Sequence, residues 1–141
     1  MTAAWAVSTA VIFVWLGMVL AISFLETPLK FQAPGVTTQI GLGIGRLVFR
    51  ALNAVETVLA VVLLVSIVLD PPPARVLVTV GIAIASLVGQ LVVVRPLLSR
   101  RTAAVLAGKD GPRSHVHYAY VGLELVKVVA LALGGILLLA A

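Results

Sequence analysis

The sequence predicts an all-α membrane protein, a bundle of four transmembrane helices with both termini on the extracytoplasmic side. Of its 141 residues, 62% are hydrophobic and 11% are charged, which is typical of a membrane protein. Four windows of mostly apolar residues are each long enough to cross a ~30 Å hydrocarbon core. They span residues 3–25, 47–69, 74–94 and 118–141, so we expect a single integral membrane domain, residues 1–141.

The placement of the basic residues predicts the orientation. Of the ten Lys and Arg residues, Arg75 lies at the outer start of the predicted third helix, near Asp70, and Lys127 lies inside the fourth. The other eight lie in or beside the predicted loops 26–46 and 95–117: Lys30, Arg46, Arg50, Arg95, Arg100, Arg101, Lys109 and Arg113. Because cytoplasmic loops collect Lys and Arg, we expect both loops in the cytoplasm against anionic lipid headgroups. This placement accounts for the net charge of +5 without a nucleic-acid partner, and we expect a multi-pass protein of the inner (plasma) membrane.

The first predicted helix, residues 3–25, carries Trp5 near its outer end and Trp15 near its middle. We assign Trp15 to packing. The helix lacks a basic n-region, and its apolar run exceeds the ~7–15 residues of a signal peptide, so we expect it to be retained. It should end near Glu26, because Pro28 cannot continue the helical hydrogen-bond ladder without a break.

The first loop leads into the second helix through Gly41, Gly43 and Gly45. Small residues at alternate positions favour close helix packing, while contact with a lipid phosphate or a small anion at the helix N-terminus remains an alternative. Four charged residues mark the predicted cytoplasmic mouth: Glu26, Lys30, Arg46 and Arg95. We expect Glu26 to form a salt bridge with Lys30 or Arg46, or otherwise to be a vestibule group.

A polar stripe runs along the second helix. Arg46, Asn53 and Glu56 follow one another at +7 and +10, which places them on one helical face. This face must point into the bundle. The third helix, residues 74–94, carries Gln90 in its cytoplasmic half, where an amide in hydrocarbon needs a hydrogen bond to another helix.

The fourth helix carries Glu124 and Lys127 inside its apolar run. Each charge facing lipid would cost ~2.5–3.5 kcal/mol at the helix centre, so both must face protein or water. Counted from the cytoplasmic helix ends at ~1.5 Å per residue, Asn53 lies at the depth of Glu124, and Glu56 lies at the depth of Lys127. Lys127 can therefore pair with Glu124 on its own helix or with Glu56 across the bundle.

Two carboxylates and one ammonium leave one negative charge uncompensated. This imbalance invites either a bound cation or a proton on one glutamate. Ionisable groups inside a membrane commonly mark ion pathways or proton relays, although a charged cluster that only fixes helix register remains open. The candidate ion, proton or substrate centre consists of Asn53, Glu56, Gln90, Glu124 and Lys127.

His115 and His117 are weak candidates for metal binding. Histidines at i and i+2 of a helix do not share a face, and the chain has no cysteine to join them, so a site would need ligands from elsewhere. The alternative is a pair of pH-sensitive interfacial histidines. The sequence leaves any cofactor undetermined. It contains no serine elbow, HExxH or CxxC motif, which favours a protein that is not an enzyme.

Four stretches carry a resemblance to known proteins: ETPLKFQAPG (26–35), IGRLVFRALNAVE (44–56), VVVRPLL (92–98) and HYAYVGLELVKVVAL (117–131). Through them nearly the whole chain looks like the small four-helix bacterial inner-membrane proteins of uncharacterised families, a resemblance that implies no established activity. The length, the four helices and an acidic residue in helix one are also similar to small multidrug-resistance transporters. Here, however, Glu26 lies at the end of helix one, and the charge bias is strong where dual-topology members keep it weak. The substrate residues of those transporters are therefore not carried over.

These observations favour a proton- or ion-linked transporter or a channel-like protein with a buried polar centre. We expect a homo-oligomer, because four helices enclose little volume. The first alternative is a non-transporting accessory or structural membrane subunit. The second is a membrane protein that binds a quinone, a haem or a lipid.

Overall fold

The computed structural model describes residues 1–108 and 115–141, and in the second range it describes side chains from residue 117 onward. The regular elements of this part of the chain are all helices. Four helical rods are long and apolar enough to cross a membrane, which confirms the predicted all-α class with four such helices. The rods are Ala3–Lys30, Thr38–Leu69, Ala74–Leu106 and His117–Leu139.

The first rod continues past the position where we expected it to end. It consists of α1 (Ala3–Val19), the π-helical segment η1 (Leu20–Glu26) and α2 (Thr27–Lys30). In η1 the N–H of Thr27 donates to the carbonyl of Ile22, five residues earlier. A proline ring clashes with the carbonyl four residues before it, and the wider π turn allows the chain to remain helical through Pro28.

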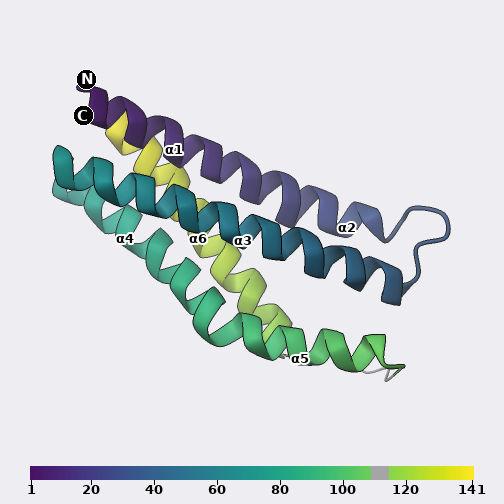
Figure 1. Ribbon diagram of the computed structural model, residues 1–141. Coiled ribbons are helices and arrows are strands. Elements are labelled where there is room, and N and C mark those ends of the chain that lie inside the picture. The colour runs from purple at the N-terminus through teal and green to yellow at the C-terminus, as the bar shows by residue number, and fades with distance from the viewer. Residues whose placement is uncertain (109–114) are drawn as a thin grey trace.

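The third rod also contains a π-helical segment shortly before a proline. It consists of α4 (Ala74–Gly89), η2 (Gln90–Val94) and α5 (Arg95–Leu106). The N–H of Arg95 donates to the carbonyl of Gln90, directly before Pro96. π turns and prolines are the usual causes of a helix bend, and Figure 1 shows this rod bending between α4 and α5. As a result, α5 occupies the first half of the predicted loop 95–117.

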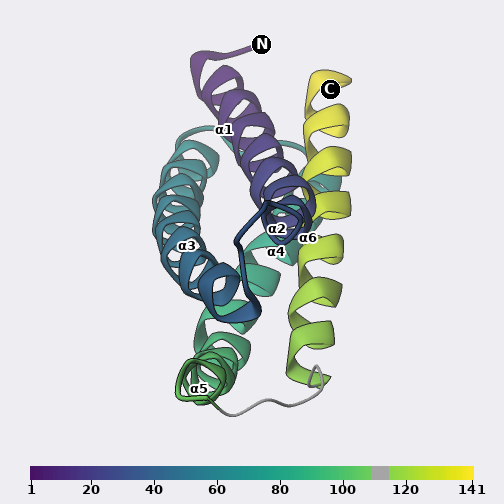
Figure 2. The ribbon, with the colours of Figure 1, turned by 90° about the vertical axis from the view of Figure 1, so that its right-hand side faces the viewer.

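The remaining rods are α3 (Thr38–Leu69) and α6 (His115–Leu139). α3 begins inside the predicted loop 26–46, because the hydroxyl of Thr37 accepts from the N–H of Ile40 and so caps the helix start. α1 packs against both α3 and α6, and α6 packs against α4. Figure 2 shows α1 between α3 on one side and α6 on the other.

The bundle has two distinct ends. Both chain termini lie at one end, beside the turn from α3 to α4 (Figure 1); we call the half of the bundle nearer to them the termini half. The opposite half, which includes α2, α5 and the connection of residues 31–37, we call the loop half.

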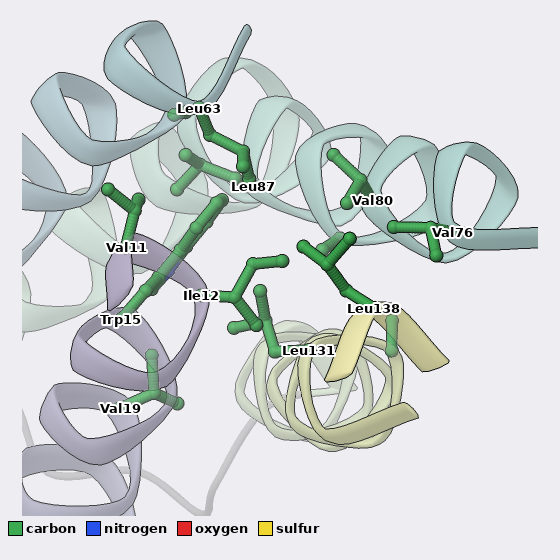
Figure 3. Packing of buried hydrophobic residues seen from close by; sticks show 13 residues of the cluster. Val11, Ile12, Trp15, Val19, Leu63, Val76, Val80, Leu87, Leu131 and Leu138 are labelled. Atoms are coloured by element: carbon green, nitrogen blue, oxygen red, sulfur yellow. The ribbon is translucent and has the colours of Figure 1, made fainter. Parts of the chain in front are cut away.

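The hydrophobic core fills the termini half. Figure 3 shows Trp15 of α1 reaching toward Leu63 of α3 and Leu87 of α4, while Leu138 of α6 lies beside Val76 of α4. The other buried members of this core are Val11, Ile12, Val19, Ala60, Val80, Ala83, Ala130 and Leu131. This packing occupies the termini half, and the buried charges lie near the middle of the bundle.

Candidate functional site

A buried cluster of four side chains, Glu56, Gln90, Glu124 and Lys127, lies near the middle of the bundle; we call it the polar centre. Each of these residues is at most 1% exposed. Nζ of Lys127 lies 2.5 Å from Oε2 of Glu56 and 2.5 Å from Oε1 of Glu124. It also donates to Oε1 of Gln90 at 2.8 Å. An ammonium has three N–H donors, so every donor of Lys127 has an acceptor.

The Glu124 carboxylate is also fully paired. Oε1 accepts from Lys127 and, at 3.0 Å, from Nε2 of Gln90. Oε2 accepts from the hydroxyl of Ser23 in η1. Each oxygen of Glu124 therefore has at least one hydrogen-bond donor from the protein.

Glu56 differs from Glu124 in one oxygen. Oε2 accepts from Lys127 and, at 2.7 Å, from the indole Nε1 of Trp15. Oε1 is buried and has no hydrogen-bond partner within the part of the chain that the structure describes. Buried polar atoms are nearly always paired, so this oxygen is where the polar centre is able to take up a proton.

The structure pairs the predicted residues of the centre in part as their depths indicated. The Glu56–Lys127 contact joins the two residues predicted at one depth, and Lys127 binds Glu124 as well. Asn53 is also buried, but its Oδ1 accepts from the hydroxyl of Tyr120 at 3.4 Å. Asn53 therefore forms a second polar contact beside the centre.

Three residues that donate near the centre were not among the predicted site residues: Trp15, Ser23 and Tyr120. Trp15 packs in the core, as expected, but it also donates to Glu56. The buried residues of α1 recur every three or four positions at Ser8, Ile12, Trp15 and Val19, and the next position in this stripe is Ser23. That periodicity was the available signal for Ser23. Tyr120 had a comparable signal, because it precedes Glu124 by four residues and Lys127 by seven and so shares their helical face.

The predicted mouth residues form two pairs at the loop half. Nζ of Lys30 lies 3.7 Å from Oε2 of Glu26, which is one of the two salt bridges we expected. Nη2 of Arg95 donates to the carbonyl of Arg46 at 3.2 Å. The Glu26–Lys30 pair joins neighbouring turns of the first rod, and the Arg95–Arg46 contact connects α5 to α3.

The glycines before the second predicted span lie inside α3 and allow close contacts. A Cβ on Gly41 would lie 2.1 Å from the ring of Phe31, and a Cβ on Gly45 would lie 2.8 Å from Nζ of Lys30. A Cβ on Gly43 would meet no described atom within 4 Å. Close packing therefore explains Gly41 and Gly45, as their spacing favoured.

Two pockets open in the loop half. The larger, about 790 Å³, lies between η1, α2, α3, α5 and α6, and Ser23 and Glu124 of the polar network line it. The smaller, about 370 Å³, lies between α3 and the η2–α5 segment, and Asn53 is among its lining residues. Arg95 lines both pockets. Solutes entering from the loop half can therefore approach the polar centre closely.

His117 lines the larger pocket, and its ring lies edge-on to the ring of Tyr118 with 5.7 Å between centroids. The side chain of His115 lies outside the described residues. Among the side chains that the structure describes, residues 1–108 and 117–141, no three His, Cys, Asp or Glu are grouped so as to hold a metal ion. Comparison with protein-family models, curated proteins and solved structures gave no match, so the geometry of the polar centre and its pockets is the basis for assigning a function.

Proposed function

We propose that the protein is a proton-linked membrane transporter in which Glu56 carries the proton. The observation that supports this role is the unpaired, buried Oε1 of Glu56, beside a Lys127 and a Glu124 whose polar atoms are all paired. With all three groups ionised, the polar centre has a charge of −1, and a net charge is costly in a low-dielectric interior. One proton on Glu56 removes that charge. A proton needs only one oxygen, whereas a metal ion needs several.

The access route supports transport rather than a continuous channel. The larger pocket reaches Glu124 from the loop half, while the apolar core fills the termini half. Transporters open their site to one side at a time, and this arrangement matches a state open at the loop half. The basic residues of the loop half favour a cytoplasmic position for it, and we propose the inner membrane as the location. Four helices leave little room for a path, so we propose a homo-oligomer.

The two π-helical segments connect the polar centre to the helices that would move. Ser23 in η1 and Gln90 in η2 both donate to the carboxylate of Glu124. π turns interrupt a helix and recur at functional sites. Protonation of Glu56 weakens its electrostatic attraction for the Lys127 ammonium, and deprotonation restores it. Because Lys127 also binds Glu124, a shift of Lys127 would move Glu124 and, through its hydrogen bonds, η1 and η2. We propose that these segments are the hinges of the conformational change.

Current recording on proteoliposomes tests this proposal. Vesicles adsorbed to a solid-supported membrane are given a proton gradient and a panel of cations, lipophilic amines and anionic amphipaths. The wild type should give a proton-coupled current with at least one solute, and Glu56→Gln should abolish it. Asp70→Asn, which removes a carboxylate at the turn between α3 and α4, is the matched control. A proton-coupled current of wild-type size in Glu56→Gln would contradict the proposal.

A non-transporting accessory role is the second candidate. It is favoured by the complete pairing of Lys127, whose contacts tie α3 and η2 to α6. Such a cluster could act only as a clamp. Under that role no solute would produce a current, Glu56→Gln and Glu124→Gln would change only the melting temperature, and the protein would co-purify with one larger complex.

A further inference from the structure

Lys30 is a partly buried cation that lines the larger pocket. Its side chain is 9% exposed, and it lines the pocket together with Phe31 and Phe49. The ammonium lies 5.6 Å and 5.9 Å from the centroids of these two rings. It donates no hydrogen bond to any residue that the structure describes, and Glu26, its salt-bridge partner, is 3.7 Å away. The ammonium therefore keeps N–H donors that no described residue accepts, and the pocket is the space from which an acceptor can reach them.

A second cation faces the same pocket from another helix. Arg95, at the start of α5, uses Nη2 for the carbonyl of Arg46, and a guanidinium has five N–H donors. Arg101 and His117 also line the pocket. The one carboxylate among the lining residues, Glu124, is paired with Lys127. The lining of the pocket therefore favours an anion.

The remaining walls of the pocket are largely apolar. They include Phe24, Leu42, Leu98, Val105 and Val121 in addition to the rings beside Lys30. The volume of about 790 Å³ lies in the range of ~300–1,000 Å³ that is usual for small-molecule sites. A small inorganic anion would leave most of these walls without contact. A molecule with an anionic head and an apolar chain matches both parts of the lining.

We infer that this pocket binds a phosphate monoester carried on an apolar chain, with Lys30 and Arg95 binding the phosphate. Such a phosphate has a charge of about −1.5 to −2 at pH 7 and three acceptor oxygens. This charge matches two cations better than the single charge of a carboxylate does. Lysine binds phosphate as a point charge, while an arginine fork binds two of its oxygens. The inference rests on the proposed transport function, since it names the substrate class of the pocket that reaches Glu124 of the polar centre.

A binding titration with short-chain phosphatidic acid as the probe tests this inference. The purified full-length protein in phosphatidylcholine nanodiscs is titrated with phosphatidic acid, with phosphatidylcholine of the same chains and with inorganic phosphate. We expect saturable binding of phosphatidic acid alone. Lys30→Gln and Arg95→Gln should each weaken it about tenfold or more, because each removes a charge-assisted hydrogen bond. Arg100→Gln, which removes an exposed cation outside the pocket, should bind as the wild type does.

A pair of glycine variants tests the site without removing a charge. Gly45→Ala places a methyl group 2.8 Å from Nζ of Lys30 and should weaken binding of phosphatidic acid. Gly43→Ala, in the same helix, meets no described atom within 4 Å and should leave binding unchanged. This pair remains informative even if Lys30→Gln or Arg95→Gln does not fold.

Three results would overturn the inference. If phosphatidylcholine binds as well as phosphatidic acid, the phosphate monoester is not recognised. If inorganic phosphate binds as well, the apolar chain of the lipid is not recognised. An effect of Arg100→Gln as large as that of Lys30→Gln would indicate general surface attraction. The transport proposal is tested separately by Glu56→Gln, which should bind phosphatidic acid normally but carry no proton-coupled current. A proton-coupled current without phosphatidic acid binding would remove this inference alone.

Discussion

The termini half and the loop half of the bundle are built from the same four helical rods but have different interiors. The termini half is filled by apolar side chains such as Ile12, Leu63 and Leu138, each 0% exposed. The loop half holds both pockets, the two π-helical segments and the polar contacts of Asn53 and Tyr120. Hydrocarbon outside a bundle is as apolar as its core, so close packing rather than water exclusion holds the termini half together.

The polar centre lies at the boundary between these two halves. Trp15 shows the boundary most clearly, because it belongs to the apolar core and its indole N–H also donates to Glu56. Ser23 makes the matching contact to Glu124 from the side of the larger pocket. The comparison indicates that the packed termini half is the rigid part of the bundle. The loop half contains the pockets that lead toward the polar centre and the π-helical segments that we propose as hinges. Substitutions in the two halves should therefore have different consequences.

The largest expected effect is at the boundary itself. Lys127→Met keeps the length of the side chain but leaves two buried carboxylates without their cation. Loss of one partner from a buried ion pair costs about 3–5 kcal/mol, and we expect the free energy of unfolding to fall by that amount in a denaturing-detergent titration. Arg75→Met, at an exposed position in the termini half, is the control and should lie within about 0.5 kcal/mol of the wild type. Equal losses in the two variants would refute a special role for Lys127.

A core substitution should affect stability without affecting function. Leu63→Ala leaves a cavity in the termini half, and we expect a loss of about 2–3 kcal/mol, near the lower end for buried leucines, because lipid contributes no hydrophobic transfer term. Binding of phosphatidic acid and the proton-coupled current should persist at temperatures where the variant is folded. If Leu63→Ala removed binding while the variant remained folded, the functional division between the halves would be wrong.

The two glutamates of the polar centre should differ in their contribution to stability. Glu124→Gln leaves Lys127, Gln90 and Ser23 with a weaker shared acceptor, and unmet buried polar groups cost about 1–3 kcal/mol. Glu56→Gln keeps the neutral Lys127–Glu124 pair and should cost less than about 1 kcal/mol. Unfolding titrations of both variants in the same detergent check this order. The reverse order would mean that Glu56, rather than Glu124, is the permanent counter-ion of Lys127.

The smallest effect separates two glycines of α3 in the loop half. Gly41→Ala places a methyl group 2.1 Å from the ring of Phe31. Overpacking costs about 1–3 kcal/mol, partly offset by the gain of about 1 kcal/mol from replacing glycine in a helix. Gly43→Ala has room for the methyl group and should retain that gain. Melting temperatures should therefore change in opposite directions, and a shift in the same direction would contradict the packing seen at Phe31.

Helix number and the depth of the charges could be predicted from the sequence, because both follow from spacing along one helix. Matching depths correctly placed Glu56 near Lys127. The rotation of one helix relative to another does not follow from depth, which is why Asn53 pairs with Tyr120. The first helix has no charged residue before Glu26, so its contribution through Trp15 had no electrostatic signal.

The helix ends were harder to predict than the helix cores. Proline usually ends a helix, yet Pro28 and Pro96 lie inside continuous rods. The compensating π turns depend on backbone hydrogen bonds between Ile22 and Thr27 and between Gln90 and Arg95. No residue type specifies such a turn, so the sequence could not indicate it. The pockets likewise depend on how α5 lies against α3 and α6, which local patterns do not determine.

The protonation state of Glu56 tests the central claim most directly. Infrared spectra of the protein at neutral pH, in ordinary and in heavy water, reveal a protonated carboxyl group by a carbonyl band that shifts on deuteration. The wild type should show this band, Glu56→Gln should lack it, and Glu26→Gln should retain it. If the band is missing from the wild type, or if it persists in Glu56→Gln, Glu56 is not the proton carrier.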